Sequence, residues 1–591
     1  MFAERTHCGD LSVADDGKEV VVCGWVDRRR DHGGVIFVMV RDVSGDIQVV
    51  ADETHSKEAA LSADKLRNEY CVYVKGKIRK RTPENINPNI KSGEIELVAA
   101  EIKILSESAP TPFSIETRDN LSEEVRLKYR FLDLRRAEMQ EAMIKRHEVM
   151  QVTRNYLTKN RFYEIETPIL NKSTPEGARD FLVPSRINKG EFYALPQSPQ
   201  MFKQILMMSG FDRYFNIVKC FRDEDLRNDR QPEFTQIDME LSFIDQDMII
   251  EIIEGLLKDI VKAVKGIEVK TPFIRISYDE AMSRFGKDAP DTRFGLELCD
   301  LSDVFKNSTF NVFANALASK GVVKAIAVEN GEKVSRKMID EWTEYVKTFK
   351  AGGLPNVRFR NGAFEGGFAK FLSDDEKKGI IEKMNPKEDS IIFFGSDKKN
   401  VVYDTLGNLR IKIARELDLI DKDKLNFLWV TDFPLFEYSE EDKRFYAKHH
   451  MFTAPSPETI PLLENMNPDN VDDMKALAYD IVLNGSEIGG GSIRINRMDL
   501  QKKMFDLLGM SEEEAKVKFS FLLDALQFGA PPHGGLALGL DRVMMLLLKR
   551  DSIRDVIAFP KTQKGQCMMS NAPSEVAIDQ LKELSIRVIG Q

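Results

Sequence analysis

The sequence predicts an α+β protein of several domains, on three observations. The first is a set of five strand-like segments and one helical stretch within residues 1–108. The second is a charged hairpin at 219–241, followed much later by a glycine-rich strand that runs into an apolar helix at 529–548. The third is a separate run of apolar strands and helices at 296–420. At 591 residues and 42% hydrophobic, the chain can form roughly three or four domains.

Composition narrows the class of protein. The net charge of -10 argues against binding nucleic acid over the whole surface, so any such contact needs a local basic patch. The six cysteines are scattered with no C-x-x-C spacing, which argues against a disulfide framework and a zinc site. No apolar run approaches bilayer-spanning length, and the first residues have no signal-peptide core. We therefore expect a cytoplasmic protein that does not enter membranes.

The first domain, residues 1–108, is predicted to be a small β-barrel. Its strand-like segments are 20–26, 35–42, 47–50, 70–80 and 95–105, with a helical stretch near 57–67. Five strands with a helix after the third suit an OB barrel, whose open face binds oligonucleotides. Phe37 and Gln48 offer a stacking ring and an amide beside basic residues at 28–30 and 75–81. The alternative is that Phe37 belongs to the barrel core and the basic residues are solvated rims.

The hairpin at 219–241 carries candidate chemistry. An apolar approach at 217–221 and an alternating return at 234–241 are joined by a charged loop that contains a proline. Arg222 and Glu224 are predicted on the entering strand, where both would project to one face. A guanidinium there suits a phosphate or carboxylate, and the carboxylate can accept from an amino group. Taken alone, a charged hairpin is more often a solvated edge.

A second candidate element lies about three hundred residues further along the chain. Residues 529–542 read GAPPHGGLALGLDR, and apolar residues follow, so a glycine-rich strand is predicted to enter a buried helix that begins near Arg542. An arginine in such a place is costly to bury unless it meets an anion. The sequence therefore predicts that Arg542 binds a negatively charged group.

Three motifs in order resemble those of the class II aminoacyl-tRNA synthetases. They are RFYEIETP at 161–168 after a helical run at 136–160, FRDE at 221–224 and GLALGLDR at 535–542. The resemblance covers almost the full chain and implies an antiparallel sheet flanked by helices. The chain also lacks G-x-G-x-x-G and G-x-x-x-x-G-K-[ST], which fits a fold other than a Rossmann or P-loop domain.

By this resemblance, Arg222 and Arg542 are the catalytic residues, with Arg222 on the α-phosphate and Arg542 on the γ-phosphate of ATP. The implied ATP-binding residues are Arg222, Asp223, Glu224, Gln231, Phe234, Glu487, Gly539, Leu540, Asp541 and Arg542. Asp480 and Glu487 lie beside a glycine run, across a predicted helix-to-strand turn. Paired carboxylates suit Mg²⁺ with phosphate oxygens completing the shell, and the family places its metal ligands there. Two solvated acids are the alternative.

The amino acid is assigned from short stretches. QSPQMFK at 197–203 resembles the aspartyl-specific motif, and the loop STPEGARDF at 173–181 is suited to closing over a ligand, although it could be an ordinary surface loop. The implied aspartate-binding residues are Glu176, Ser198, Gln200, Lys203, Arg222, Asp238, His449 and Arg494. Lys203 and Arg494 supply cations for an acidic side chain. A bound asparagine would leave these two cations unpaired. His450 could share the role of His449, and either could be a loop histidine.

The resemblance also assigns residues to the tRNA. In the subgroup with aspartyl, asparaginyl and lysyl enzymes, the barrel binds the anticodon, here through Arg30, Phe37, Gln48 and Glu94, with Glu96 as a neighbouring candidate. Bacterial members that charge only tRNA-Asp often carry leucine at the position of His32, whereas histidine is common among those that also charge tRNA-Asn. We therefore expect tRNA-Asp as a partner and tRNA-Asn as a possible second one.

The expected domain organisation follows from the same motifs. The predicted parts are an anticodon-binding domain at 1–108, a hinge at 109–138, a catalytic domain at 139–295 and 421–560, an insertion at 296–420 and a C-terminal extension at 561–591. The insertion resembles that of bacterial aspartyl enzymes, and nothing within it suggests chemistry. By the same resemblance, the helix from 136 and the strand ending at Pro168 are expected to form the interface of a homodimer.

The sequence therefore predicts an aspartate–tRNA ligase. Such an enzyme uses ATP to convert L-aspartate to aspartyl-adenylate and pyrophosphate, and then transfers the aspartyl group to the 3′-terminal adenosine of tRNA. One alternative is an asparaginyl-tRNA synthetase, which should not combine QSPQMFK with the bacterial insertion. Another is a non-catalytic RNA-binding paralogue, which tends to lose the motif arginines, whereas Arg222, Arg494 and Arg542 are present.

Overall fold

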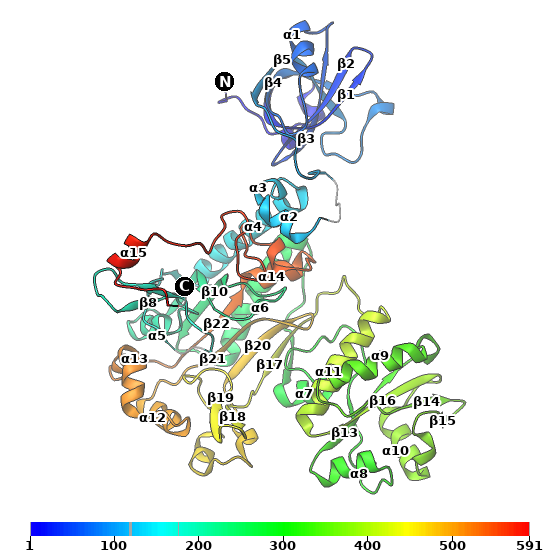
Figure 1. Ribbon diagram of the computed structural model, residues 1–591, viewed down its shortest axis with the longest axis vertical. Coiled ribbons are helices and arrows are strands. Elements are labelled where there is room, and N and C mark those ends of the chain that lie inside the picture. The colour runs from blue at the N-terminus through cyan, green and yellow to red at the C-terminus, as the bar shows by residue number, and fades with distance from the viewer. Residues whose placement is uncertain (1, 117–120, 175–176, 590–591) are drawn as a thin grey trace. The chain divides into compact units, whose positions relative to one another are not determined.

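The computed structural model describes residues 2–116, 121–174 and 177–589 (Figure 1). The chain divides into two compact units. The first comprises Met1–Glu141 with Cys567–Ala572, and the second comprises Ala142–Gln566 with Pro573–Gln591. No helix among the described residues is long and apolar enough to cross a membrane.

The first unit contains a closed five-stranded barrel with the strand order β1-β2-β3-β5-β4, which confirms the predicted OB fold. Its elements are β1 Glu19–His32, β2 Val35–Asp42, β3 Gly45–Asp52, α1 Lys57–Asp64, β4 Cys71–Lys80 and β5 Ile95–Ser106. Alternate residues of each strand fill one core, as Ile47, Val49 and Ala51 do from β3. The side chain of Ser56 caps α1 by accepting from the backbone N–H of Ala59.

Strand β1 is longer than the predicted segment, which ended at Val26. A bulge between Val26 and Arg28 shifts the register, and pairing with β2 then continues through Arg30↔Phe37 to His32↔Val35. The basic run therefore lies on a strand. This unit also contains 3₁₀ turns at Cys8–Asp10, Val13–Asp15 and Pro83–Asn85. Two short helices, α2 Glu123–Lys128 and α3 Arg130–Asp133, precede the start of the long helix α4 Ala137–Lys159.

The second unit is built on an eight-stranded sheet with the order β11-β17-β20-β21-β22-β10-β9-β6. Its pairs are antiparallel except β11–β17 and β6–β9, which are parallel, so the predicted antiparallel class II sheet is confirmed. The strands are β6 Tyr163–Glu164, β9 Arg213–Phe221, β10 Glu233–Ser242, β11 Ile274–Ser277, β17 Phe427–Thr431, β20 Ala478–Leu483, β21 Ser486–Ile493 and β22 His533–Gly539.

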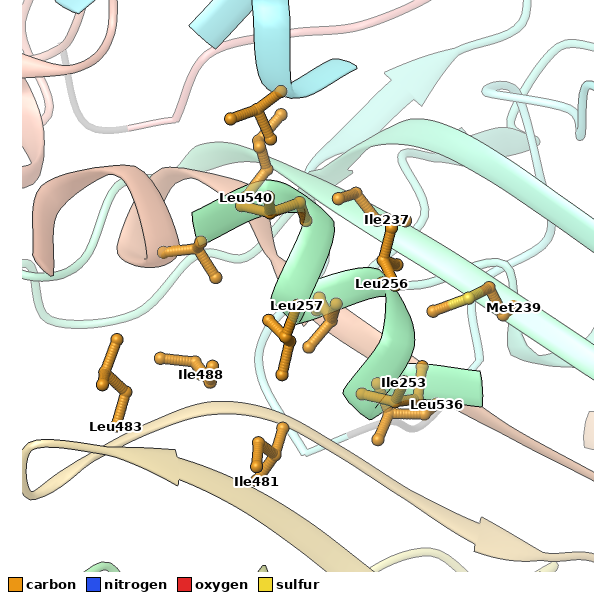
Figure 2. Packing of buried hydrophobic residues seen from close by; sticks show 14 of the residues in the cluster. Ile237, Met239, Ile253, Leu256, Leu257, Ile481, Leu483, Ile488, Leu536 and Leu540 are labelled. Atoms are coloured by element: carbon orange, nitrogen blue, oxygen red, sulfur yellow. The ribbon is translucent and has the colours of Figure 1, made fainter. Parts of the chain in front are cut away.

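One face of this sheet packs against helices α4, α6 Gln246–Lys265 and α14 Leu540–Leu547. Figure 2 shows Leu256 and Leu257 of α6 in this core with Ile237 and Met239 of β10. Because successive strand residues point to opposite faces, Gln236, Asp238 and Glu240 of β10 must face the other side. The two faces of β10 thus separate the core from a polar surface.

Two local predictions are wrong. Asp480 and Glu487 lie on a β20–β21 hairpin rather than at a helix-to-strand turn, because Asn484 and Gly485 take positive φ values of 53° and 79° and form a tight turn between strands. Arg222 and Glu224 lie just beyond β9, which ends at Phe221, rather than on the strand. The backbone N–H of Arg222 still donates to Pro232 O at 2.9 Å, so the hairpin holds its position.

Residues 296–420 form a separate five-stranded sheet with the order β12-β13-β16-β14-β15. Helices cover both faces, with Trp342 in one apolar cluster and Phe313 in the other. The strands and helices are β12 Cys299–Asp300, α8 Asn311–Ala318, β13 Val322–Val328, α9 Arg336–Lys347, β14 Asn356–Arg360, β15 Ala363–Glu365, α10 Asp374–Met384, β16 Ser390–Asp397 and α11 Lys399–Glu416, with short 3₁₀ turns at Gly331–Lys333 and Ala369–Phe371.

The remaining elements of the second unit surround the eight-stranded sheet. They are β7 Leu182–Pro184, β8 Phe192–Ala194, α5 Gln200–Met208, α7 Tyr278–Phe285, β18 Phe436–Ser439, β19 Arg444–Ala447, α12 Met498–Leu507, α13 Glu512–Leu526 and α15 Ile578–Glu583, with 3₁₀ turns at Ile460–Asn465, Val471–Asp473 and Ile553–Asp555.

Candidate functional site

A cavity of about 650 Å³ lies on the polar face of the eight-stranded sheet. Its floor is made by alternate residues of β10 and by glycines of β21 and β22, such as Gly490 and Gly539, which leave room above the sheet. The lining includes both predicted catalytic arginines, Arg222 and Arg542. Two guanidinium groups more than three hundred residues apart in sequence therefore face one space.

One end of the cavity holds a buried network of four charged side chains. Lys203 Nζ of α5 lies 2.8 Å from Asp238 Oδ1 and 3.3 Å from Glu240 Oε2. Arg494 grips the same Glu240 through Nε at 3.0 Å and Nη2 at 3.3 Å, and its Nη1 donates to Ser492 Oγ at 2.7 Å. Neither cation is unpaired, so the charges of this network balance before any ligand binds.

Three polar atoms around this network have no hydrogen-bond partner among the described residues. They are Asp238 Oδ2, Gln200 Nε2 and His450 Nε2, and all three residues line the cavity. Nδ1 of His450 accepts from the backbone N–H of Phe452 at 3.3 Å, which leaves the proton of the neutral ring on Nε2. An acceptor and two donors thus stand ready for a ligand with both an ammonium and an acidic group.

Burial sets the protonation of these groups. It raises the pKa of Asp238 to about 6, against the lowering effect of Lys203. Burial also acts to raise the pKa of Glu240, but Arg494 and Lys203 overcome it and the pKa is lowered. Desolvation lowers the pKa of His450 to about 3. At neutral pH the pocket therefore holds two carboxylates and a neutral His450.

His449 lies beside this end of the cavity and is accessible from it. Its ring meets that of Phe433 edge-on at 4.4 Å between centroids. Desolvation by the surrounding protein, followed by the positive charge of Lys448, lowers the pKa of His449 to about 4. The ring is therefore neutral at neutral pH. Ser198 also lines the cavity, whereas Glu176, predicted to bind the ammonium, lies outside the described residues.

The other end of the cavity carries the arginines. The Arg222 guanidinium lies 5.2 Å from the ring centroid of Phe234. Arg542 donates through Nη1 to Glu487 O at 2.6 Å, and its Nη2 lies 3.3 Å from Asp229 Oδ2. Glu224 accepts from Arg230 Nη1 at 3.0 Å. These groups combine an aromatic face with two guanidiniums, which suits a nucleotide base and its phosphates.

Several predicted ATP-binding residues have structural partners instead of open faces. Asp541 is buried and accepts from the backbone N–H of Thr235 at 2.7 Å and from Arg146 Nη1 at 2.5 Å. The Gln231 amide pairs with the backbone of Lys561, at 2.7 and 3.0 Å. Leu540 packs in the apolar core. These side chains hold the arginine-bearing elements in place. Gln231, Gly539 and Asp541 still line the cavity.

Asp223 differs from the other residues of its motif because it does not line the cavity. Its backbone N–H donates to Arg179 O at 3.0 Å, and its carboxylate lies 3.6 Å from Arg179 Nε. Asp223 therefore connects the hairpin loop to the predicted closing loop at 173–181. The structure gives it no direct place beside a nucleotide.

The predicted metal ligands meet above Gly490. A Cβ added there would lie 2.3 Å from Asp480 Oδ1 and 3.6 Å from Glu487 Oε1, so both oxygens border the same small space. Burial, followed by the charge of Glu487, raises the pKa of Asp480 well above its usual range. Among the described residues no group of three or more His, Cys, Asp or Glu side chains is arranged to hold a metal ion. Any cation here needs oxygens from a ligand to complete its shell.

The barrel of the first unit presents a separate set of predicted residues. Phe37 is partly exposed while its neighbours Ile36 and Val38 are buried, so its ring faces outward rather than into the barrel core. The exposed His32 meets this ring edge-on at 5.8 Å between centroids. Arg30 lies opposite Phe37 in the strand register. The three side chains form one surface on which a base could stack.

Gln48 on this surface has a fixed orientation. Its Nε2 donates to Glu96 Oε2 at 3.1 Å, and Glu96 accepts from Arg79 Nε and Nη2 at 3.0 and 2.7 Å. The amide oxygen of Gln48 is thereby turned toward a prospective ligand. Glu94 is exposed just before β5, and its carbonyl accepts from the backbone N–H of Arg81 at 2.9 Å.

Comparisons with known proteins agree with this geometry. Residues 122–563 match the family model described as tRNA synthetases class II (D, K and N), and residues 20–105 match the model of an OB-fold nucleic acid binding domain. The chain belongs to the class II tRNA synthetases.

Similar proteins are named for one activity. A protein of Caldanaerobacter subterraneus subsp. tengcongensis, named aspartate–tRNA(Asp/Asn) ligase, is 54% identical over 99% of this chain and 98% of its own length. A protein of Aquifex aeolicus with the same name is 52% identical over 100% of this chain and 99% of its own.

Among solved structures, an asparaginyl-tRNA synthetase from Pyrococcus horikoshii with asparaginyl-adenylate matches with a TM-score of 0.59 at 21% identity, over 95% of this chain and 98% of its own. An aspartyl tRNA synthetase from Entamoeba histolytica matches with a TM-score of 0.57 at 18% identity, over 94% and 91%. These likenesses show the shared fold.

The structure adds residues to the class II synthetase site that sequence reasoning missed. Glu240 is fully buried and holds both Arg494 and Lys203, although the alternation of β10 already placed it on the same face as Asp238. Gly535 is required beside it, since a Cβ there would lie 1.8 Å from Glu240 Oε2. Asp288 also lines the cavity, from the stretch 286–295, which the sequence marked only as the approach to the insertion and not as part of the site.

Proposed function

We propose that this class II synthetase is an aspartate–tRNA ligase. It forms aspartyl-adenylate and pyrophosphate from L-aspartate and ATP, and then transfers the aspartyl group to the 3′-terminal adenosine of tRNA-Asp, and of tRNA-Asn as well. The observation that carries this proposal is that Arg222 and Arg542 share one cavity with the buried Lys203–Arg494 network. The names of the similar proteins point to the same activity.

The amino acid binds at the charged network by exchanging partners within it. The α-ammonium binds Asp238, whose Oδ2 has no partner among the described residues. This contact draws Asp238 away from Lys203, which then offers its ammonium, beside Arg494, to the side-chain carboxylate. Asparagine brings no second negative charge, so its binding would leave a buried cation without compensation. His449 and Gln200 close the pocket as neutral donors.

ATP occupies the arginine end. Phe234 presents its ring to the adenine, Glu224 accepts from the adenine amino group, and Arg542 binds the γ-phosphate. Arg222 bridges the carboxylate of the amino acid and the α-phosphate. The carboxylate attacks the α-phosphorus in line and pyrophosphate leaves, so no side chain needs to act as nucleophile or base. Catalysis then rests on placement and on neutralising the charge that develops at the phosphate.

Mg²⁺ fits the Asp480–Glu487 pair. The two carboxylate oxygens border one space above Gly490, and burial with the charge of Glu487 raises the pKa of Asp480, so a cation bound there would stabilise the ionised pair. When bound, the ion would orient the phosphates and reduce their negative charge. The chain's own part is to hold both carboxylates on one hairpin, while the Glu487 carbonyl fixes Arg542 nearby.

For the tRNA, the outward face around Phe37, His32 and Gln48 offers a ring and an oriented amide for an anticodon base. For the dimer, apolar side chains are exposed near β6 at the edge of the large sheet. Tyr163 is 60% exposed and meets Phe211, which is 40% exposed, and Leu170 is 52% exposed nearby in sequence. A second copy would remove these groups from water, and sedimentation at micromolar concentration tests for it.

The decisive experiment is ATP–pyrophosphate exchange with the purified chain, with aspartate or asparagine as the amino acid. We expect exchange with aspartate and little with asparagine, followed by charging of purified tRNA-Asp and tRNA-Asn. Exchange that depends on asparagine would favour an asparaginyl enzyme. No exchange with either, together with retained tRNA binding, would favour a non-catalytic paralogue.

A further inference from the structure

The segment at 286–296, which connects α7 to the inserted region, is held against the cavity by helix α11 of that region. Arg410 of α11 is fully buried. Its Nη2 donates to Asp291 O and Gly295 O, both at 3.0 Å, and its Nε donates to Leu296 O at 3.2 Å. One side chain thus fixes three backbone carbonyls of the segment.

Aromatic and backbone contacts tighten this attachment. The Arg410 guanidinium lies 5.1 Å and 4.4 Å from the ring centroids of Phe285 and Phe294. Gly286, which ends α7 with φ of 65°, lies so close to α11 that a Cβ on Gly407 would be 2.4 Å from Gly286 O. The start of the segment and α11 are therefore in direct backbone contact.

The other side of the segment packs on the hairpin that bears the predicted metal ligands. Gly485, at the turn between β20 and β21, lies so close to the segment that an added Cβ would be 2.7 Å from the Cβ of Asp291. Thr292 Oγ1 accepts a hydrogen bond from Asn426 Nδ2. The segment is thus fixed between the inserted region and the sheet that carries the site.

Asp288, in the middle of this fixed segment, lines the cavity together with Lys448 and His449. Its side chain is exposed and forms no ion pair or hydrogen bond with the described residues. Lys448 Nζ lies 3.2 Å from Glu437 Oε2, and its pKa is raised, against the effect of burial, by Tyr278, Glu437 and Asp288. Asp288 and Lys448 thus face one cavity as opposite charges.

Lys448 begins a short segment, residues 448–450, that follows β19 and lines the amino-acid end of the cavity. The backbone N–H of Lys448 donates to Leu435 O at 3.1 Å, which anchors this segment at its first residue. His449 follows directly, and its ring meets that of Phe433 edge-on. The position of the Lys448 side chain therefore bears on where the His449 ring stands relative to a bound amino acid.

We propose that Asp288 is a positioning residue for aspartate activation, which pairs with Lys448 across the filled cavity and so holds His449 against the amino acid. The inserted region keeps Asp288 in place through Arg410. This inference rests on the proposed function, and it gives residues 296–420 a working part in the active site. Asp288 touches neither reacting atom in this account and acts only through Lys448.

The test compares four variants in the full chain by aspartate-dependent ATP–pyrophosphate exchange. They are Asp288→Asn, Arg410→Met, the double variant, and Arg415→Met, which changes an exposed arginine on the same helix as a control. The KM for aspartate, the KM for ATP and kcat are measured at a temperature where each variant is shown to be folded by its melting curve.

We expect Asp288→Asn to raise the KM for aspartate about fivefold, the size of one accessible ion pair, with kcat, the KM for ATP and Tm close to wild type. Arg410→Met should lower Tm, because three carbonyls lose their donor, and should also raise the KM for aspartate. The double variant should be no worse than the stronger single one, because both act through Asp288. Arg415→Met should change none of these constants.

An unchanged KM for aspartate in Asp288→Asn would overturn the proposal. The proposal would also be overturned if the rise in KM of the double variant equalled the product of the rises in Asp288→Asn and Arg410→Met. A rise in the Mg²⁺ requirement in place of the KM for aspartate would instead make Asp288 a partner of the metal pair and would also refute it. If wild-type protein shows no aspartate-dependent exchange, the proposed function itself falls. If wild-type exchange is intact and Arg410→Met changes only Tm, the inserted region has no part in activation.

Discussion

Removing the Arg222 guanidinium should slow aspartate activation without unfolding the protein. Among the described residues Arg222 has no carboxylate partner, and its side-chain contact is with the Phe234 ring at 5.2 Å. Losing that cation–π contact costs folding only about 0.5–1 kcal/mol. The substitution Arg222→Gln therefore separates catalysis from stability, which most charged residues of this cavity do not allow.

The expected kinetic loss is much larger. One preorganised donor to a developing oxyanion is worth about 3–4 kcal/mol, so kcat should fall about 10²- to 10³-fold. Since Arg222 also binds the ground-state carboxylate, the KM for aspartate should rise, but by less than kcat falls.

The assay is ATP–pyrophosphate exchange at saturating aspartate and ATP, beside thermal unfolding of the same samples. Arg227→Gln is the matched control, because Arg227 lies in the same loop, is exposed, and does not line the cavity. The role given to Arg222 would be refuted if kcat of Arg222→Gln fell less than about tenfold, or if kcat of Arg227→Gln fell by as much as that of Arg222→Gln. A fall in Tm of many degrees would show that the residue supports the fold.

Three further predictions concern pH, metal and tRNA. Because the pKa of Asp238 is raised to about 6, the anionic acceptor for the α-ammonium is lost as pH falls through about 6. The KM for aspartate should therefore rise about tenfold for each pH unit below 6. A KM that does not change with pH would contradict this prediction. Asp480→Asn should raise the Mg²⁺ concentration needed for half-maximal exchange about tenfold or more. It should also raise Tm without Mg²⁺ at neutral pH, because ionising a buried carboxyl with a raised pKa costs folding energy. His32→Leu should lower tRNA-Asn charging relative to tRNA-Asp, since it removes the ring that meets Phe37; an unchanged ratio would remove that argument.

Much of the fold was readable from local patterns. The alternation of β10 assigned Ile237 and Met239 to the core and Asp238 to the site, because a strand has a strict period of two residues. The same pattern failed at 478–493, where Asn484 and Gly485 are a hairpin signal that the glycine run beyond them obscured. A glycine-rich strand looks unlike a strand because its small residues serve the cavity above it and not the sheet.

The candidate site was less readable than the fold, for a physical reason. Motif residues indicate which elements converge, but the partners that hold them come from anywhere in the chain. Gln231 and Asp541 line the cavity as predicted, but Gln231 also pairs with the backbone of Lys561, and Asp541 with Thr235 and Arg146. Such contacts depend on tertiary neighbours that no spacing rule reveals.

Charge balance in the buried network limits how the pocket can select aspartate. The sequence suggested that Lys203 and Arg494 supply cations to the aspartate side chain, and each cation already has a carboxylate partner within about 3 Å. Lys203 lies 2.8 Å from Asp238, and Arg494 lies 3.0 Å from Glu240. A surplus of positive charge therefore cannot be the source of selectivity. The incoming amino acid must instead exchange partners, with its ammonium taking Asp238 and its side chain taking the cation released. Both exchanges are needed together, because either alone leaves one buried charge uncompensated, at about 3–5 kcal/mol for a broken pair. Selectivity against asparagine then follows from the second exchange, and selectivity against succinate, which lacks the ammonium, follows from the first.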